Sequence, residues 1–326
     1  MLVLGLQGSP RLKSNTNFLL STFLDEAEKL GARTHLVHVD QKNILPCKEY
    51  VVCEKKGYCP IHDDMETEIY ALLREADIVV AATPIFFYNT TAQLKALIDR
   101  SQTLWARKYR LNLTDPNRNW RKGFLLAVGA TRGKNLFEGI DLTMKYFFDA
   151  VGASYDSTAM LAYRQIEKPG DMKKHPTVIQ DVKESVAGLM APFTGRKKIL
   201  FACRENACRS QMAGAFAQLH AGDKIEAYTA GSEPAQQVSP MMEKVMAEKG
   251  IDMGFRKPRE LNQAIAETSP DILVTMGCGE NCPFVPGCKR EDWNLPDPAG
   301  KPIEFMRDLR DKIENKVKNL IQEVSA

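Results

Sequence analysis

The stretch that decides the fold of the second half of the chain is KKILFACRENACRSQMAGAFAQ, residues 197–218. It opens with an apolar run that predicts a buried β-strand and ends with a segment that predicts a helix. Between them, five residues separate Cys203 from Arg209, and Ser210 follows directly. Such a loop can curl into a ring of backbone N–H donors that the N-terminus of the next helix closes. The sequence therefore predicts a pocket for a small tetrahedral oxyanion.

The residue types of this loop suit nucleophilic chemistry. The helix dipole and the amide donors activate the sulfur of Cys203 as a nucleophile, and the guanidinium of Arg209 can clamp two oxygens of an oxyanion. Asn206 is expected to brace the loop. The alternative, an inert core cysteine beside a surface arginine, is disfavoured by the strand before the loop and the helix after it. The predicted oxyanion loop comprises Arg204, Glu205, Asn206, Ala207, Cys208 and Ser210.

A proton donor for the departing oxygen is predicted further along the chain. The segment LPDPAGKP, residues 295–302, places Asp297 between two prolines that restrict its loop. Displacement of an oxygen atom needs such an acid. By itself an Asp-Pro pair is more typical of a turn.

The segments CRENACRS, AYTAGSEP and PDILVTMGCGENCP…EDWNLPDPAG resemble the arsenate reductases that are built on the low-molecular-weight tyrosine-phosphatase fold. The resemblance implies that Cys203 bonds arsenic, that Arg209 clamps the oxyanion, that Ser210 supports the loop and that Asp297 is the general acid. Cys278 or Cys282 would attack the adduct or its sulfur, which releases arsenite and leaves a disulfide. Phosphatases of this fold carry aromatic residues just after the Asp-Pro pair, where this chain has Ala299-Gly300.

Several questions about this half stay open at the level of sequence. The short spacing between Cys278 and Cys282 is closer to the branch that uses a low-molecular-weight thiol than to the thioredoxin-coupled branch, so either reductant is considered. Cys288 is interpreted as a bystander, and a zinc site with Cys278 and Cys282 would lack a fourth ligand. No metal site is predicted. The alternative function is a low-molecular-weight protein-tyrosine phosphatase fused to a quinone or ferric flavin reductase, and a non-enzymatic metalloid sensor is disfavoured.

The first half carries a different set of loops. In LGLQGSPRLKSNTNFLL, residues 4–20, hydroxyls, amides and an arginine lie between a strand and a helix, which suits a phosphate monoester. In VVAATPIFFYNTTAQLKALIDR, residues 79–100, a proline-aromatic turn follows another strand and could pack on a flat ring. The segment GATRG, residues 129–133, follows a further strand. Loops at the carboxyl edge of a parallel sheet form a cofactor crevice.

These segments resemble the NAD(P)H-dependent FMN reductase and iron–sulfur flavoprotein families. The resemblance implies bound FMN, with NADH or NADPH as hydride donor, and a homo-oligomer, either a dimer or a tetramer. The implied phosphate site comprises Ser9, Arg11, Ser14, Asn15 and Thr16. The implied isoalloxazine site comprises Pro84, Ile85, Phe86, Phe87, Tyr88, Asn89, Thr131 and Gly133.

The iron–sulfur branch of that family has a compact motif of four cysteines. Here Cys47, Cys53 and Cys59 lie on the motif, but Tyr50 stands at the second cysteine position. Because three thiolates are an incomplete set for a cubane cluster, a [4Fe–4S] centre is not expected. Thiol exchange with the other domain, or no function, are the alternatives.

Apolar runs of strand length alternate with helical stretches, and this alternating pattern occurs once in each half of the 326 residues. This predicts an α/β protein with two doubly wound parallel-sheet domains, flavodoxin-like and then low-molecular-weight-phosphatase-like. We expect the flavin domain over 1–192, a linker over 193–197 and the arsenate reductase domain over 198–326. The flavin domain could supply electrons to the second. A net charge of +3 and short apolar runs argue against nucleic-acid and membrane partners, and a cytoplasmic location is expected.

Overall fold

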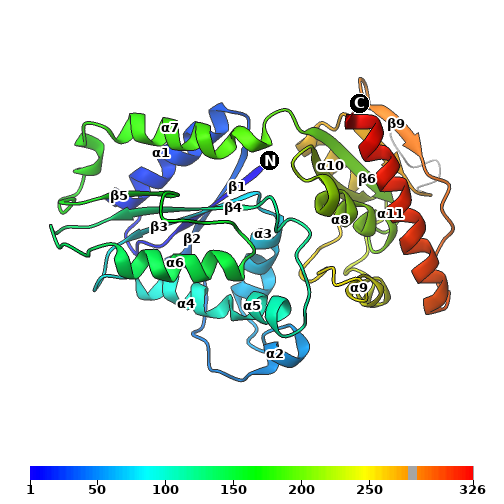
Figure 1. The fold of residues 1–326 in the computed structure, drawn as a ribbon, viewed down its shortest axis with the longest axis horizontal. Coiled ribbons are helices and arrows are strands. Elements are labelled where there is room, and N and C mark those ends of the chain that lie inside the picture. The colour runs from blue at the N-terminus through cyan, green and yellow to red at the C-terminus, as the bar shows by residue number, and fades with distance from the viewer. Residues whose placement is uncertain (278–284, 326) are drawn as a thin grey trace. The chain divides into compact units, whose positions relative to one another are not determined.

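The computed structural model describes residues 1–277 and 285–325 of the chain (Figure 1). These residues divide into two compact units. One comprises Met1–Asn112 with Arg118–Pro192, and the other comprises Leu113–Asn117 with Phe193–Ala326. The short segment Leu113–Asn117 joins the second unit because Thr114 forms backbone hydrogen bonds with Gly250 and Asp252.

A five-stranded parallel sheet forms the centre of the first unit. Its order, β2-β1-β3-β4-β5, confirms the flavodoxin-like prediction. The middle strands are apolar along almost their whole length because helices cover both faces of the sheet. The strands are β1 (Leu2–Gln7), β2 (Arg33–His38), β3 (Ile78–Pro84), β4 (Lys122–Val128) and β5 (Met160–Tyr163).

Helices pack on the two faces of this sheet. Figure 1 shows α1 (Asn15–Lys29) and α7 (Val178–Met190) on one face, and α4 (Ala92–Arg100) and α6 (Glu138–Ala150) on the other. The remaining helices of the unit are α2 (Val52–Lys56), α3 (Tyr70–Glu75) and α5 (Gln102–Tyr109), with short helical turns at Val39–Gln41, Met65–Ile69, Met172–Lys174 and Ala191–Phe193.

The fifth strand begins later than its sequence predicts. The apolar pattern favours a strand over residues 154–161, whereas β5 covers Met160–Tyr163. Asp156 accepts hydrogen bonds from the backbone and the hydroxyl of Thr158, and its carbonyl accepts from Ala159. A side chain that bonds the backbone two residues on stabilises a turn in competition with a strand.

A second parallel sheet, of order β7-β6-β8-β9, forms the centre of the second unit. Its strands are β6 (Lys197–Cys203), β7 (Ile225–Gly231), β8 (Ile272–Thr275) and β9 (Lys289–Asp292). One apolar core joins α8 (Arg209–Ala221), α9 (Pro240–Ala247) and α11 (Ile303–Ser325), and a smaller one joins α10 (Leu261–Thr268) to the opposite face. The sequence does not predict β9, because its four residues, KRED, are all charged and lack the apolar pattern of a strand. Charged residues are common in strands at the edge of a sheet.

The passage between the units is shorter than the predicted linker. Phe193 belongs to a helical turn and Lys197 to β6, which leaves residues 194–196 outside regular structure. Among the helices in the described part of the chain, none has the length and apolar character needed to cross a membrane.

Candidate functional site

The predicted oxyanion loop lies where β6 ends and α8 begins. β6 is the first strand of its sheet, with β7 on one side and β8 on the other, so the loop emerges at the topological switch point. Ligands of open α/β sheets bind at this place because the neighbouring connections diverge there and leave a crevice. The sequence therefore directs Cys203, at the last position of β6, to the usual ligand site of the fold.

The backbone of the loop turns its carbonyl groups outward. The carbonyls of Cys203, Arg204, Glu205 and Ala207 accept hydrogen bonds from backbone amides between residues 232 and 239. By contrast, the amides of residues 204–210 have no acceptor among the described residues. A ring of free amides at a helix N-terminus is an anion-binding nest.

Asn206 holds this ring in shape from inside the protein. Its backbone has a φ of 49°, in the left-handed region that asparagine tolerates better than most residues. The buried side chain donates to Ser210 Oγ at 2.8 Å and accepts from Gln211 Nε2 and from the amide of Arg259. None of these bonds uses a backbone amide of residues 204–210.

The two cysteines of the loop have different surroundings. Cys203 Sγ lies 3.0 Å from Ser210 Oγ. Since Asn206 already donates to that oxygen, the hydroxyl proton of Ser210 is free to point at the sulfur. Cys208 packs beneath the loop against Met306, and its burial raises the pKa of its thiol to about 12. Only Cys203 is therefore suited to act as the nucleophile of this loop.

Arg209 connects the oxyanion loop with the loop of the predicted acid. Its Nη1 donates to the carbonyl of Leu295 at 3.3 Å, and its Nη2 lies 3.5 Å from Asp297 Oδ1. Asp297 is 70% exposed, whereas Arg209 is buried. A Cβ at Gly277 would lie 3.1 Å from Nη1, so the backbone before the predicted relay cysteines lies against the same guanidinium.

The predicted relay cysteines Cys278 and Cys282 lie outside the described residues. Cys288 is described and is a free, partly exposed thiol packed at the edge of the α10 core, and burial raises its pKa. The structure thus places Cys203 beside Ser210, and Arg209 of the next helix beside Asp297.

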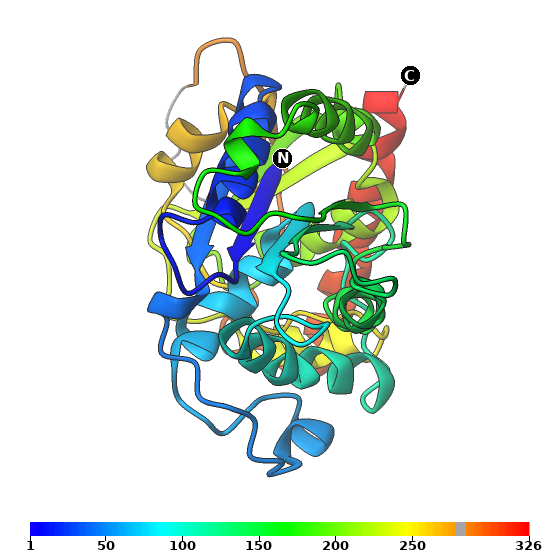
Figure 2. The same cartoon turned by 90° about the vertical axis from the view of Figure 1, so that its left-hand side faces the viewer.

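Three loops of the first unit meet at the carboxyl edge of its sheet, which Figure 2 views end on. They follow β1, β3 and β4, on either side of the switch point between β1 and β3. Thr91 Oγ1 donates to the carbonyl of Gly8 at 2.6 Å, which fastens the β3 loop to the β1 loop. A Cβ at Gly8 would lie 2.9 Å from the carbonyl oxygen of Ala82, so only glycine allows this approach.

The loop after β1 presents backbone amides at the start of α1. Ser14 caps the helix by accepting from the amide of Asn17, and the amides of residues 12–16 have no acceptor among the described residues. Ser9 is buried and Arg11 is exposed, while Thr16 is buried in the first turn. Asn15 differs from its expected role because its side chain binds the backbone of Lys168, Gly170 and Met172. It ties two loops together instead of facing the expected phosphate.

The aromatic turn after β3 stands out from the protein. Pro84 ends the strand, Ile85 bonds to β4, and the backbones of Phe86 and Asn89 bond each other across the turn. Phe87 is fully exposed and Tyr88 half-exposed, both with positive φ. Tyr88 lies beside the loop after β4, since a Cβ at Gly133 would be 2.8 Å from the Tyr88 hydroxyl. The amide of Gly133 donates a hydrogen bond to the hydroxyl of Thr131.

Some residues of both crevices escaped sequence reasoning. Gln7 is fully buried at the end of β1, accepts from the amide of Ser9 and leaves its Nε2 without a partner among the described residues. Arg164, the residue that follows β5, donates to the carbonyl of Gly133 and so supports that loop. Ser232, whose amide bonds Cys203, has a buried hydroxyl without a described partner. A polar residue inside an apolar strand was the available signal for Gln7.

Comparisons with known proteins agree with two separate sites. The family model of NADPH-dependent FMN reductase matches residues 1–157, and that of low molecular weight phosphotyrosine protein phosphatase matches residues 198–326. An iron-sulfur flavoprotein of Methanosarcina thermophila is 36% identical over 40% of this chain and 65% of its own length. Another, of Methanocaldococcus jannaschii, is 33% identical over 53% of this chain and 87% of its own. The glutaredoxin arsenate reductase of Synechocystis is 35% identical over 40% of this chain and 99% of its own.

The folds and the two crevices define a two-domain α/β oxidoreductase. The chain belongs to the NADPH-dependent FMN reductase family through its first domain, and to the low-molecular-weight phosphatase family, with arsenate reductase relatives, through its second. It is a fusion of the two.

Proposed function

We propose that the second domain reduces arsenate to arsenite through a covalent adduct on Cys203. The observation that carries the proposal is the run of free amides at residues 204–210, which starts directly after Cys203 and includes Ser210, whose hydroxyl oxygen lies 3.0 Å from the Cys203 sulfur. Free amides at a helix N-terminus suit a small tetrahedral oxyanion, and the exposed Asp297 lies 3.5 Å from Arg209 Nη2.

The first step displaces one oxygen of arsenate. The Cys203 sulfur bonds arsenic, Asp297 gives a proton to the departing oxygen, and water leaves. The free amides and Arg209 stabilise the charge that develops on the remaining oxygens. Ser210 directs its hydroxyl proton to the sulfur and supports its anionic form.

The second step transfers two electrons. A second thiolate, from Cys278 or Cys282, attacks the Cys203 sulfur, an S–S bond forms, and the S–As bond breaks with its electron pair on arsenic. Arsenite leaves and a disulfide remains. Thioredoxin, glutaredoxin or a low-molecular-weight thiol could reduce this disulfide, and the fusion offers an internal route from the first domain.

The crevice of the first domain fits FMN. The free amides of residues 12–16 with Ser9, Ser14 and Arg11 would hold its phosphate, and the exposed aromatic turn at Phe87 and Tyr88 would lie against its ring. The buried Nε2 of Gln7 is a donor without a described partner at this edge. When bound, the flavin accepts hydride from NADH or NADPH and passes electrons on.

The test of the arsenate proposal compares turnover of arsenate with hydrolysis of an aryl phosphate. Arsenite formation should require Cys203 and at least one of Cys278 and Cys282, even in a single turnover. A chain that hydrolyses the phosphate ester equally well after Cys278→Ser and Cys282→Ser, and never releases arsenite, would be a phosphatase. Cys288→Ser serves as the matched thiol control.

A further inference from the structure

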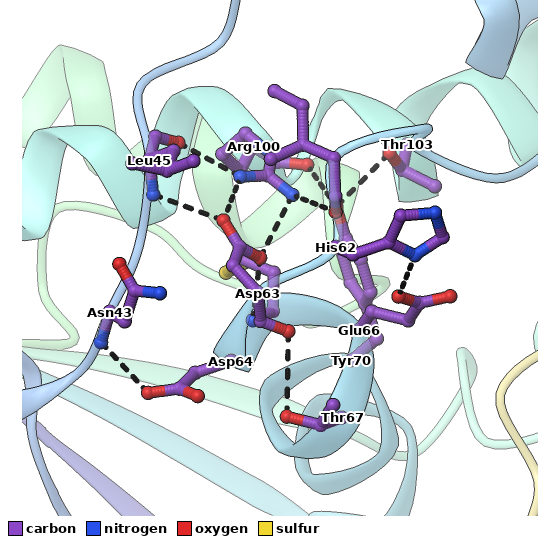
Figure 3. Close-up of polar contacts among 12 residues, drawn as sticks. Asn43, Leu45, His62, Asp63, Asp64, Glu66, Thr67, Tyr70, Arg100 and Thr103 are labelled. Carbon is purple, nitrogen blue, oxygen red and sulfur yellow. Dashed lines mark hydrogen bonds and ion pairs between the residues drawn. The ribbon is translucent and has the colours of Figure 1, made fainter.

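The loop that carries Cys47, Cys53 and Cys59 is closed at its neck by one buried ion pair (Figure 3). Arg100 of α4 pairs with Asp63, and both side chains are fully buried. The guanidinium also donates to the carbonyl of Leu45 at 2.8 Å and of Ile61 at 3.2 Å. Asp63 in turn accepts from the amide of Leu45. One side chain of α4 therefore fixes both ends of the cysteine loop.

This neck brings the outer cysteines toward each other. Cys47 lies two residues beyond Leu45, and Cys59 lies two residues before Ile61. Because two residues of extended chain span at most about 7 Å, each cysteine lies within about 7 Å of the residue that Arg100 holds. Arg107 Nη1 donates to the carbonyl of Gly57 at 2.9 Å and holds the returning limb, while Cys53 lies in α2 between the two.

The Cys53 thiol is affected by its burial and by the other two cysteines of the loop. Burial, and then the charges of Cys59 and Cys47, raise the pKa of the Cys53 thiol. The surroundings of Cys53 thus disfavour the accumulation of thiolate charge.

A four-thiolate cluster does not fit this loop. The fourth position is occupied by Tyr50, which points into solvent with 56% of its surface exposed. Among residues 1–277 and 285–325 no three Cys, His, Asp or Glu side chains are gathered into a ready ligand set, so a three-thiol site needs the chain around Cys47 to close on Cys53 and Cys59. Residues 46–51 are exposed and form no helix or strand, so this limb can move toward Cys53 and Cys59.

We propose that Cys47, Cys53 and Cys59 form a binding site for trivalent arsenic, the product of the proposed reaction. Trivalent arsenic forms three bonds in a pyramid, so three soft thiolates complete its shell and a fourth ligand has no place. One molecule of arsenious acid and three thiols give three As–S bonds and three molecules of water. Arsenic stays trivalent, no electron is transferred, and the product is neutral. The neutral product suits a loop that resists thiolate charge.

The inference deepens the proposed function, and its test works without the catalytic thiols. The full-length chain with Cys203, Cys278 and Cys282 replaced by serine is reduced and titrated with sodium arsenite. As–S absorbance in the near ultraviolet and the number of thiols left reactive are measured together. We expect one arsenite per chain and the protection of three thiols.

Variants in the same background locate the site. Cys47→Ser, Cys53→Ser and Cys59→Ser should each raise the Kd for arsenite more than about tenfold. Cys288→Ser, in the other domain, should leave it unchanged, and circular dichroism shows that each variant is folded. Undiminished binding in the three loop variants would overturn the proposal, as would iron and broad visible absorbance in the anaerobically purified native chain.

The two proposals fail separately. A chain that binds arsenite at the loop but never reduces arsenate would reject the proposed reaction alone. Arsenate turnover without arsenite binding in the serine background would reject the loop site alone.

Discussion

Ser210 is the residue on which the nucleophile depends most directly. It accepts from Asn206 and faces the Cys203 sulfur at 3.0 Å. Ser210→Ala removes the hydrogen bond that would support the proposed Cys203 nucleophile, and a hydrogen bond to a charged group is worth about 1.5–3 kcal/mol. We expect arsenate turnover to fall about tenfold or more. The rate of alkylation of Cys203 by iodoacetamide should fall as well, and an unchanged rate would show that the hydroxyl does not support the sulfur.

Gly277 controls the approach of Arg209. Its φ is +74°, and a Cβ there would lie 3.1 Å from the guanidinium. Gly277→Ala adds about 1–2 kcal/mol of backbone strain and displaces Arg209. We expect weaker inhibition by inorganic phosphate, measured as a higher inhibition constant, together with a lower Tm.

Gly188 provides the control for that substitution. It lies in α7, and a Cβ would meet no atom within 4 Å. Gly188→Ala should stabilise the chain by about 0.5–1 kcal/mol and leave phosphate inhibition unchanged. If Gly277→Ala and Gly188→Ala had the same inhibition constant for phosphate, the role assigned to Gly277 would be contradicted.

At the scale of elements, the buried pair between α4 and the cysteine loop should dominate local stability. Asp63→Asn leaves the charge of Arg100 buried without a partner, so we expect a loss of about 3–5 kcal/mol in the free energy of unfolding. The matched control is Asp99→Asn in α4, since Asp99 pairs with Lys95 at 2.6 Å on the surface. It should cost less than about 1 kcal/mol. Urea unfolding measures both, and similar losses would refute the assigned difference.

Acid should loosen α11 from α9. Hydrogen bonds from Arg310 lower the pKa of Asp311 to about 2. Burial by itself would raise the pKa of Glu314, but hydrogen bonds from Lys249 and Lys318 hold it at about 2. Because both folded pKa values lie below the unfolded values near 4, this stability is present above about pH 4 and is lost as the pH falls toward 2.

The measurement is the free energy of unfolding of the chain, determined at several pH values from about 5 to about 2. Glu314→Gln should flatten the curve over that range, because a glutamine does not titrate. A slope as steep as that of the native chain would show that other groups carry the acid sensitivity.

At the scale of the whole molecule, two electron-handling domains share one chain. If the flavin domain reduces the disulfide left by arsenate, then NADPH or NADH consumption should depend on arsenate without any added thiol. The oxidation rate should disappear in Cys203→Ser, while reduction of an artificial acceptor by the flavin domain stays unchanged. Activity restored only by an added thiol or thioredoxin would exclude internal transfer.

Sequence alone determined the two parallel-sheet domains, because buried parallel strands are apolar runs and their spacing is local. It also predicted the oxyanion loop, since residues 203–210 are contiguous between a strand and a helix, although the bonds that hold the loop in shape come from distant residues. The late start of β5 and the edge strand β9 could not be predicted, because a side-chain turn at Asp156 and a charged edge oppose the local pattern.

Only the tertiary structure decided which distant groups meet. Arg209 reaches Leu295 and Asp297, Asn15 turns to the backbone of residues 168–172, and Arg100 closes the cysteine loop. These contacts join residues that are far apart in the chain, so no local pattern encodes them. They form because leaving a buried charge or amide without a partner is costly, so packing favours arrangements that pair most of them.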